Sequence, residues 1–267
     1  MLDPILAAVL ILLPPSEGKS TPSRGKPLDL AALSSPELTP AREQVLEALV
    51  ALCAADPVRA AEVLGLSPGQ ADLVLRNAGL REAPTARADR IYTGVLYDAL
   101  DVESLSAAAK RRATSRLGVA SSLFGLVRMG DRLPSYRLSG DATLPDLGPV
   151  AGVWREALPD VMAAAIGRGL FVDLRSGMYA NFWRPGPELA KRTATVRVLH
   201  EHNGTRKVVS HFNKATKGRI VRALLEDGAD PRTPTALAAT LERLGWTVEV
   251  GAPGKAGTQL DVVVGEL

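Results

Sequence analysis

Two lysines in the last third of the sequence stand where a helix should be apolar. Apolar residues recur with helical spacing between 220 and 225, and a helical wheel places Lys214 and Lys217 on the same side as these residues. Lysines are rarely buried without a partner, and a cation near the start of a helix opposes the helix dipole. The alternative is that both side chains extend past the first turn into water. We favour a polar cleft in which acidic groups or phosphate offset the cost.

A further set of polar residues follows the predicted strand 169–174. Asp173 and Arg175 alternate at the end of this strand, and Ser176 and Tyr179 come directly after it. Charged side chains at the end of a buried strand pair with each other or line a site. An amine beside a carboxylate is typical of sites that tune a proton-transfer or nucleophilic group. Asp173 is therefore a hypothetical acidic partner of the two lysines.

The apolar run 5–13 has the features of neither a signal peptide nor a membrane span. No basic residue precedes it, no small-residue cleavage site follows it, and it is too short to cross a bilayer. We interpret it as a buried first strand that Pro14 and Pro15 end, because proline cannot donate to a sheet ladder. We therefore expect a cytoplasmic protein without a membrane partner.

The loop after this strand ends in Gly-Lys-Ser, which is similar to the end of a phosphate-binding loop. That loop needs a glycine five residues before Gly18, where Leu13 stands, and the two prolines remove amide donors that would hold a phosphate. We therefore do not expect a nucleoside triphosphatase. Three polar side chains of the loop are either solvated turn residues or the mouth of a site: Ser16, Glu17 and Lys19.

The composition is that of a globular protein with ample apolar material for a core. The chain has 267 residues, 46% of them hydrophobic and 23% charged, with a formal net charge of +3. This small excess of positive charge permits nucleic acid as a partner without requiring it. The single cysteine, Cys53, excludes an intramolecular disulfide and a cysteine-rich zinc site. No carboxylates or cysteines with metal-ligand spacing accompany the three histidines, so we expect no metal site. We also expect no cofactor.

Helical and strand patterns alternate along the chain, which predicts an α/β protein with a mixed sheet and surrounding helices. The expected helices are 40–55, 57–64, 68–77, 103–116, 151–166, 213–226 and 234–244. The expected strands are 5–13, 118–125, 169–174, 194–199, 206–211, 246–250 and 258–264. Asn203-Gly204 predicts a hairpin, and Pro159 is expected to kink or split its helix. Because no linker separates two cores, we predict a single domain, 1–267.

The segment 57–78 has the pattern of a helix-hairpin-helix. It contains an apolar residue, a glycine, an apolar residue and then a glycine that opens a second helix. In that motif, the hairpin amides and the second helix N-terminus bind DNA phosphate without reading sequence. Two packed helices with a Gly-Pro turn explain the pattern at least as well, because Pro68 removes one amide and only Arg76 supplies positive charge nearby.

Taken together, these segments resemble the YaaA family over nearly the whole chain. The resemblance is carried by LLPPSEGK (12–19), YTG (92–94), SSLFGL (121–126), YRL (136–138), Trp154, VDLRSGMY (172–179) and SHFNKATKGR (210–219). Their order and separation match the family together. The family's motif residues fall here on Lys19, Ser122, Arg137, Asp173, Ser176, Tyr179, Lys214 and Lys217.

The resemblance implies a one-domain α/β fold, a positively charged cleft and a helix-hairpin-helix. It also implies DNA binding, with protection of DNA and lowered free iron under peroxide stress. Together with the polar residues identified above, it gives the predicted ligand or nucleic-acid contacts: Ser16, Glu17, Lys19, Ser122, Arg137, Arg175, Ser176 and Tyr179.

Two functions follow from this set. The first is a DNA-associated stress protein whose cleft binds duplex phosphate without reading sequence. The second is an enzyme acting on a nucleobase, nucleoside or nucleotide, with Lys214 or Lys217 assisted by Asp173 or Glu17. The DNA-associated protein is the first interpretation. The mixed polar set motivates the enzyme as the alternative, since non-specific DNA binding needs only exposed Lys and Arg. A protein-interaction module has no exposed apolar or charged stripe to support it.

Overall fold

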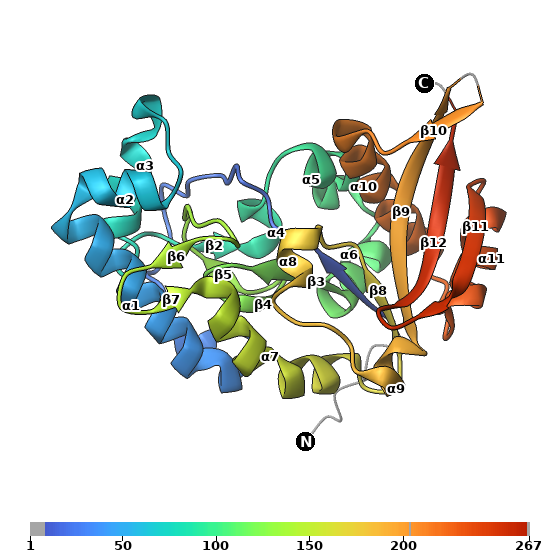
Figure 1. The fold of residues 1–267 in the computed structure, drawn as a ribbon, viewed down its shortest axis with the longest axis horizontal. Helices are drawn as coiled ribbons and strands as arrows, with labels where there is room; N and C mark the ends of the chain where they lie inside the picture. The colour runs from blue at the N-terminus through green and yellow to red at the C-terminus, as the bar shows by residue number, and fades with distance from the viewer. Residues whose placement is uncertain (1–8, 203, 266–267) are drawn as a thin grey trace.

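The structure is a computed structural model that describes residues 9–202 and 204–265, the side chains of 210 and 211 excepted. An eight-stranded sheet crosses the molecule, with helices packed around it (Figure 1). Its strands, in spatial order, are β11 (Thr247–Gly254), β12 (Gly257–Val264), β9 (Thr193–His202), β8 (Leu170–Asp173), β1 (Val9–Leu13), β3 (Leu117–Ser121) and β4 (Gly125–Arg128). A further strand, β10 (Thr205–Lys207), pairs with β9 off this path. The predicted α/β class with a mixed sheet is confirmed.

β1 lies between β3 and β8 and runs parallel to both. Ile11 pairs with Leu117 on one side and with Val172 on the other, and every residue of β1 is buried. A strand covered on both faces needs a continuous apolar run rather than alternation, and Val9–Leu13 supplies one. β9 and β12 continue the parallel arrangement beyond β8, while β4 and β11 are antiparallel to their neighbours.

The longer helices are α1 (Thr39–Ala55), α6 (Ala107–Arg116), α7 (Val150–Ile166), α10 (Ser210–Asp227) and α11 (Pro234–Arg243), and the short helix α5 (Val95–Leu100) packs beside α10. α6 and α7 pack on β1, whereas α10 and α11 pack on β9. α10 also lies very close to α5. A Cβ added at Gly218 would stand 2.2 Å from the carbonyl oxygen of Leu96, so only glycine fits at this crossing.

Shorter elements connect these layers. They are η1 (Leu30–Ala32), η2 (Pro36–Leu38), α2 (Pro57–Val63), η3 (Pro68–Gln70), α3 (Asp72–Ala78), β2 (Ala86–Arg87), α4 (Ala88–Ile91), η4 (Val102–Ser104), β5 (Arg132–Leu133), β6 (Thr143–Leu144), β7 (Gly148–Pro149), α8 (Gly177–Ala180) and α9 (Pro187–Ala190). Two of the small strand pairs, β2 with β5 and β6 with β7, lie outside the main sheet.

Two expectations around α7 and β3 differ from the structure. Pro159 lies inside α7, which remains one helix, so the predicted split does not occur. The expected strand 118–125 is instead two antiparallel strands, β3 and β4, joined by a tight turn. Gly125 makes that turn with φ of +69°. Its Cβ would stand 2.7 Å from the ring of Trp154, so the turn requires glycine for both conformation and space.

Two further expectations concern hairpins. The predicted strand 206–211 ends at Lys207, and α10 begins at Ser210. The predicted helix-hairpin-helix is not confirmed. The segment 57–78, called the α2–α3 arm below, contains two short helices joined through the 3-10 turn η3, and α3 packs on α1. Residues 5–8 of the expected first strand lie outside the described residues.

The buried apolar side chains form one continuous cluster. Cys53 and Trp154 belong to it. Arg42 of α1 is a charged residue that is fully buried among these apolar side chains. Its guanidinium donates to the carbonyls of Phe124 and Leu126, each at 3.0 Å, and so ties α1 to the turn between β3 and β4. In the described part of the chain, no helix is long and apolar enough to cross a membrane.

Candidate functional site

Three loops leave the sheet at one edge, called the carboxyl edge below. They are the segments 14–20, 122–124 and 174–179, which follow β1, β3 and β8. Because these strands are parallel, their carboxyl ends meet. The chain passes from β1 to β3 on one side and later returns to β8 on the other side of β1. In open α/β sheets, such a reversal leaves a crevice where ligands bind.

All four tyrosines of the chain are buried at the carboxyl edge. The rings of Tyr92 and Tyr97 stack with their centroids 5.4 Å apart. The Tyr136 hydroxyl lies 3.2 Å from the Tyr92 hydroxyl and 2.8 Å from the Ser121 Oγ. Tyr179 is close enough to interact electrostatically with Tyr136. Burial raises the pKa of all four phenols, so this tyrosine cluster stays protonated.

The amine of Lys19 lies against the tyrosine cluster. Its Nζ is 4.2 Å from the centroid of the Tyr136 ring and 5.7 Å from that of Tyr92. It donates one hydrogen bond, 2.7 Å long, to the carbonyl of Ser16. Burial lowers the pKa of Lys19 to about 7. The contact with the aromatic rings favours the charged form by about 0.5–2 kcal/mol, which opposes this lowering without cancelling it. Lys19 therefore supplies an amine that loses its proton more readily than an ordinary lysine.

Glu17 and Arg137 form an ion pair beside Lys19. Glu17 is two residues before Lys19, and Arg137 follows Tyr136, so the pair borders the same part of the edge. The backbone of Arg137 exchanges hydrogen bonds of 2.7 and 2.9 Å with the side-chain amide of Asn77 in α3. Among the described residues, the Arg137 Nε is buried without a hydrogen-bond partner. Arg137 is therefore held in place by its backbone while one donor remains available to a ligand.

β8 ends in a buried ion pair. Asp173 accepts hydrogen bonds from the Arg175 Nε at 2.9 Å and Nη2 at 2.8 Å, and the Arg175 side chain is only 2% exposed. Lys217 reaches the same place from α10 and donates to the carbonyl of Leu174 at 3.2 Å. Burial lowers the pKa of Lys217, and the charge of Asp173 opposes this. The structure thus brings together Lys217 and Asp173, and their part in catalysis stays a prediction.

Lys214 is placed differently from Lys217. Both were expected on the buried side of the helix, but Lys214 is exposed. The close packing of α10 on α5 is centred on Gly218, one turn further along, and the first turn of α10 extends beyond it. α10 begins at Ser210 rather than near 213, so neither lysine lies in its first turn and the helix dipole does not act strongly on either. Lys217 is enclosed, whereas Lys214 extends into water.

The predicted serines have mainly structural partners. Ser122 is fully buried and donates to the carbonyl of Leu138 at 2.7 Å. The Ser16 Oγ accepts from the backbone amide of Thr93 at 3.2 Å and so joins the loop after β1 to the segment before α5. Ser176 is exposed at the start of α8 and its side chain makes no capping hydrogen bond. Of the three, Ser176 is the one free to meet a ligand.

Sequence reasoning missed Asn77 and Tyr97. The Tyr97 hydroxyl donates to the carbonyl of Pro14 at 2.7 Å and fixes the loop after β1. Asn77 is fully buried in a short helix. Asparagine favours caps and turns over helix interiors, so its position in α3 was the available signal. Tyr97 carried no such signal, because an aromatic residue on a helix is ordinary core material.

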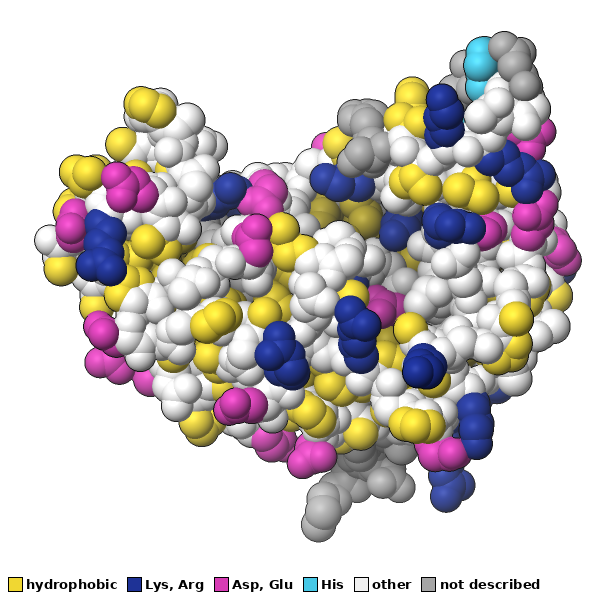
Figure 2. All heavy atoms as spheres, viewed as in Figure 1, with side chains coloured by type: hydrophobic (Ala, Val, Ile, Leu, Met, Phe, Trp, Pro, Cys, Tyr) yellow, Lys and Arg dark blue, Asp and Glu magenta, His cyan; other side chains and the backbone are white. Residues whose placement is uncertain are grey.

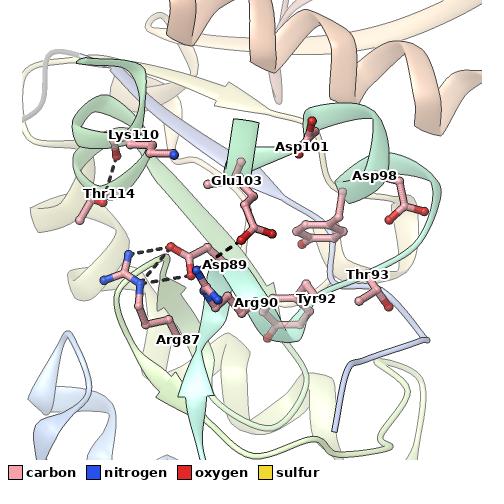
Figure 3. A pocket seen from close by; sticks show the side chains of 12 residues that line it. Arg87, Asp89, Arg90, Tyr92, Thr93, Asp98, Asp101, Glu103, Lys110 and Thr114 are labelled. Atoms are coloured by element: carbon pink, nitrogen blue, oxygen red, sulfur yellow. Dashed lines mark hydrogen bonds and ion pairs between the residues drawn. The ribbon is translucent and has the colours of Figure 1, made fainter. Parts of the chain in front are cut away.

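A cavity of about 650 Å³ lies beside the tyrosine cluster (Figure 3). Tyr92, Thr93 and Tyr97 line one part of it. Its charged lining residues are Arg87, Asp89, Arg90, Asp98, Asp101, Glu103 and Lys110. Figure 3 shows two ion pairs among these residues, Arg87 with Asp89 and Arg90 with Glu103. The cavity offers space next to the cluster, but Lys19 is not in its lining, so we place the reactive groups at the carboxyl edge. Nowhere in the described residues does a group of three or more His, Cys, Asp or Glu stand ready to hold a metal ion.

Comparisons with known proteins agree with the resemblance seen in the sequence. A family model described as "Peroxide stress protein YaaA" matches residues 9–250. A UPF0246 protein of Streptomyces coelicolor is 56% identical over 97% of this chain and 100% of its own length. One of Corynebacterium efficiens is 42% identical over 91% of this chain and 95% of its own. An uncharacterized protein of Campylobacter jejuni is 27% identical over 79% of this chain and 82% of its own length. The family description supports a role in peroxide stress, and the chain belongs to the peroxide stress protein YaaA family.

Proposed function

We propose that this chain acts in peroxide stress as an enzyme on a nucleobase, nucleoside or nucleotide held at the carboxyl edge. The observation that carries the proposal is that the basic side chains of the edge are buried or already paired, rather than exposed and free. Lys217 is buried and Lys19 lies against aromatic rings, while Arg137 and Arg175 each pair with a carboxylate. Neutralising DNA phosphate needs exposed, unpaired cations. Enclosed amines of lowered pKa near a carboxylate are instead typical of reaction sites.

Unpaired polar atoms suggest what such a ligand offers. Within the described chain, the Arg137 Nε and the Asn213 Oδ1 are buried without hydrogen-bond partners. Asn213 is four residues before Lys217 on α10, so the two side chains lie on one face of the helix. Leaving a buried donor or acceptor unpaired costs about 1–3 kcal/mol. A ligand that presents both an acceptor and a donor, as the edge of a nucleobase does, removes this cost.

The test is a screen of nucleobases, nucleosides and nucleotides by thermal shift and calorimetry, with product analysis by mass spectrometry. We expect one ligand class to raise the melting temperature and to be consumed. Lys217→Met should abolish turnover, whereas Lys214→Met, on the same helix but exposed, should leave it nearly unchanged. If no compound binds at millimolar concentration, the proposal is wrong.

Duplex DNA is the second candidate, and the shape of the molecule favours it. Figure 2 shows a hollow between the α2–α3 arm and the side formed by β9 and α10, with Lys and Arg side chains on its floor and on the latter side. Binding through phosphates should be independent of sequence and should fall steeply between ~50 and ~200 mM salt. Equal affinity at both salt concentrations, or no binding at low salt, removes DNA as a partner.

A further inference from the structure

We propose that the amine of Lys19 is a nucleophile that forms an imine with the carbonyl carbon of a sugar phosphate, the part of a nucleotide that remains when the base is lost. This inference rests on the proposed function for the position of the ligand at the carboxyl edge. It gives Lys19 a covalent step, where the sequence suggested only binding.

Lys19 differs from the other lysines of the carboxyl edge in its surroundings. Its Nζ lies 4.2 Å from the centroid of the Tyr136 ring, and its one described hydrogen bond goes to a backbone carbonyl. Lys217 is buried as well, but the charge of Asp173 favours its protonated form. Lys214 is exposed to water and has no aromatic contact of the kind described for Lys19 in the described residues. Only the neutral amine attacks a carbonyl carbon, so Lys19 is the lysine best placed to react.

Hydroxyl groups beside Lys19 complete the step. Tyr136, whose ring Lys19 contacts, shares hydrogen bonds with Tyr92 and Ser121, and its phenol stays protonated. The nitrogen lone pair of Lys19 forms the C–N bond, and the carbonyl π electrons pass to oxygen. The C–O bond then breaks, and the oxygen leaves as water with the two protons that the nitrogen loses. We assign the relay of these protons to the hydroxyl of Tyr136, whose ring contacts the amine. The step consumes no oxidant and no cofactor.

Arg137 supplies a charge for the phosphate. It pairs with Glu17, two residues before Lys19, and it follows Tyr136, whose ring the Lys19 amine contacts, so the guanidinium lies near the loop that carries the amine. Its Nε is without a partner in the described part of the chain. The Glu17 side chain is 57% exposed, so its carboxylate can move into water when an anion arrives. Guanidinium groups bind phosphate through paired N–H donors. A carbonyl compound that carries a phosphate therefore matches both Lys19 and Arg137.

Such a sugar phosphate has two sources, free deoxyribose 5-phosphate and an abasic position in duplex DNA. Both present a carbonyl at C1 when the sugar ring opens. The test incubates the full-length wild-type protein near neutral pH with deoxyribose 5-phosphate, with deoxyribose, or with a duplex that carries one abasic site. Sodium borohydride then reduces any imine to a stable secondary amine, and peptide mass spectrometry identifies the modified lysine.

Lys26 is the internal control, because it is exposed and lies in the loop that follows Lys19. The Lys26 side chain is in water, whereas the Lys19 amine lies against aromatic rings that enclose it, so we expect at least about tenfold more adduct on Lys19 than on Lys26. Lys19→Arg keeps the charge but cannot form an imine, and it should lose the adduct. The wild-type map decides the question even if that variant does not fold.

Each outcome has a defined meaning. An adduct on Lys19 with deoxyribose 5-phosphate alone identifies a free metabolite as the source, and one with the abasic duplex alone identifies DNA. Deoxyribose should react less than its phosphate, and Arg137→Gln should remove that difference. Equal modification of Lys19 and Lys26 by both phosphorylated probes overturns the proposal.

This inference and the proposed function fail separately. If a nucleobase, nucleoside or nucleotide binds in the screen but Lys19 forms no adduct, the imine is wrong and the proposed function stands. If Lys19 forms the adduct but no compound of the screen binds, the nucleobase ligand is wrong and the imine stands.

Discussion

The carboxyl edge and the α2–α3 arm differ in how far their side chains are buried. At the edge, Tyr136 and Lys217 are buried, and most polar groups bind one another. In the arm, Val58 is 74% exposed and Leu75 is 71% exposed. The edge therefore holds its polar groups in a fixed arrangement, whereas the arm presents open surface.

The two regions meet at one buried side chain. Asn77 in the arm exchanges two hydrogen bonds with the backbone of Arg137 at the edge. The arm also contributes Arg76, whose guanidinium lies 3.3 Å from the Ser135 Oγ. The sequence of the arm fits either a DNA-binding helix-hairpin-helix or two packed helices with a Gly-Pro turn. Its contacts show that it positions the segment carrying Tyr136 and Arg137, and this role does not depend on its exposed surface.

The largest effect should come from breaking the enclosed ion pair at the edge. Asp173→Asn leaves the guanidinium of Arg175 buried without its carboxylate, so we expect the free energy of unfolding to fall by about 3–5 kcal/mol. Urea denaturation measures this change. Loss of turnover in the same variant would not by itself identify Asp173 as catalytic, because the fold is affected too.

The matched control is a second Asp–Arg pair, located on the neighbouring strands β9 and β12. Asp261 binds Arg197 at 2.8 and 2.6 Å, but the Arg197 side chain is 47% exposed. Asp261→Asn should cost less than about 1 kcal/mol. Equal losses for the two variants would contradict the view that the edge is enclosed.

The contact between arm and edge should have the next largest effect. Asn77→Ala removes both hydrogen bonds to the Arg137 backbone and should lower the free energy of unfolding by about 1–3 kcal/mol. It should also weaken ligand binding at the edge, measured by calorimetry, because Arg137 loses its anchor. Leu75→Ala, at an exposed site of the same helix, should change stability by no more than about 0.5 kcal/mol. Unchanged ligand affinity at the carboxyl edge in Asn77→Ala would show that the arm does not position the site.

The enclosure of Lys19 predicts a dependence of stability on pH. Burial lowers the pKa of Lys19 from 10.5 to about 7, so the unfolded chain binds more protons between these values. Wild-type stability should therefore rise as pH increases above 7, and the cost of the buried charge is fully present below that pH. Lys19→Met removes this cost. The difference in the free energy of unfolding between the variant and wild type should therefore shrink by roughly 1–2 kcal/mol from neutral to alkaline pH. Buried tyrosines titrate above this window, because burial raises the pKa of groups such as Tyr92. Parallel stability curves for the two proteins would show that Lys19 is solvated.

Much of the sheet could be predicted from the sequence, because strands covered on both faces are continuous apolar runs. Val9–Leu13 and Leu170–Asp173 are such runs, and parallel pairing then brings the residues after them together. The pairing of Asp173 with Arg175 and the position of Lys217 follow from this geometry. Their burial was visible in the sequence as charges placed within apolar periodicity.

Contacts between distant segments could not be predicted in the same way. Helical periodicity gives the face of the helix on which Lys214 lies. It does not show where the contact between α5 and α10 ends, so the exposure of Lys214 could not be predicted. The tyrosines lie on four separate segments, and no local pattern shows that they converge. Arg42 looked like an ordinary surface residue, whereas it is buried on the carbonyls of the β3–β4 turn.

The smallest effect should come from exposed cations, and it concerns DNA. Lys214 is exposed at the start of α10, and the Arg76 side chain is 29% exposed and paired with Asp72. If duplex phosphates bind in the hollow of Figure 2, Lys214→Ala should weaken binding by less than about 1 kcal/mol and reduce the salt slope by about one. Arg76→Ala should change affinity less, because its guanidinium already has an acidic partner. The measurement is fluorescence anisotropy with a labelled duplex over a salt series. A larger loss for Arg76→Ala than for Lys214→Ala would mean that the α2–α3 arm contacts DNA directly, and the comparison drawn here between a reactive edge and a positioning arm would have to be revised.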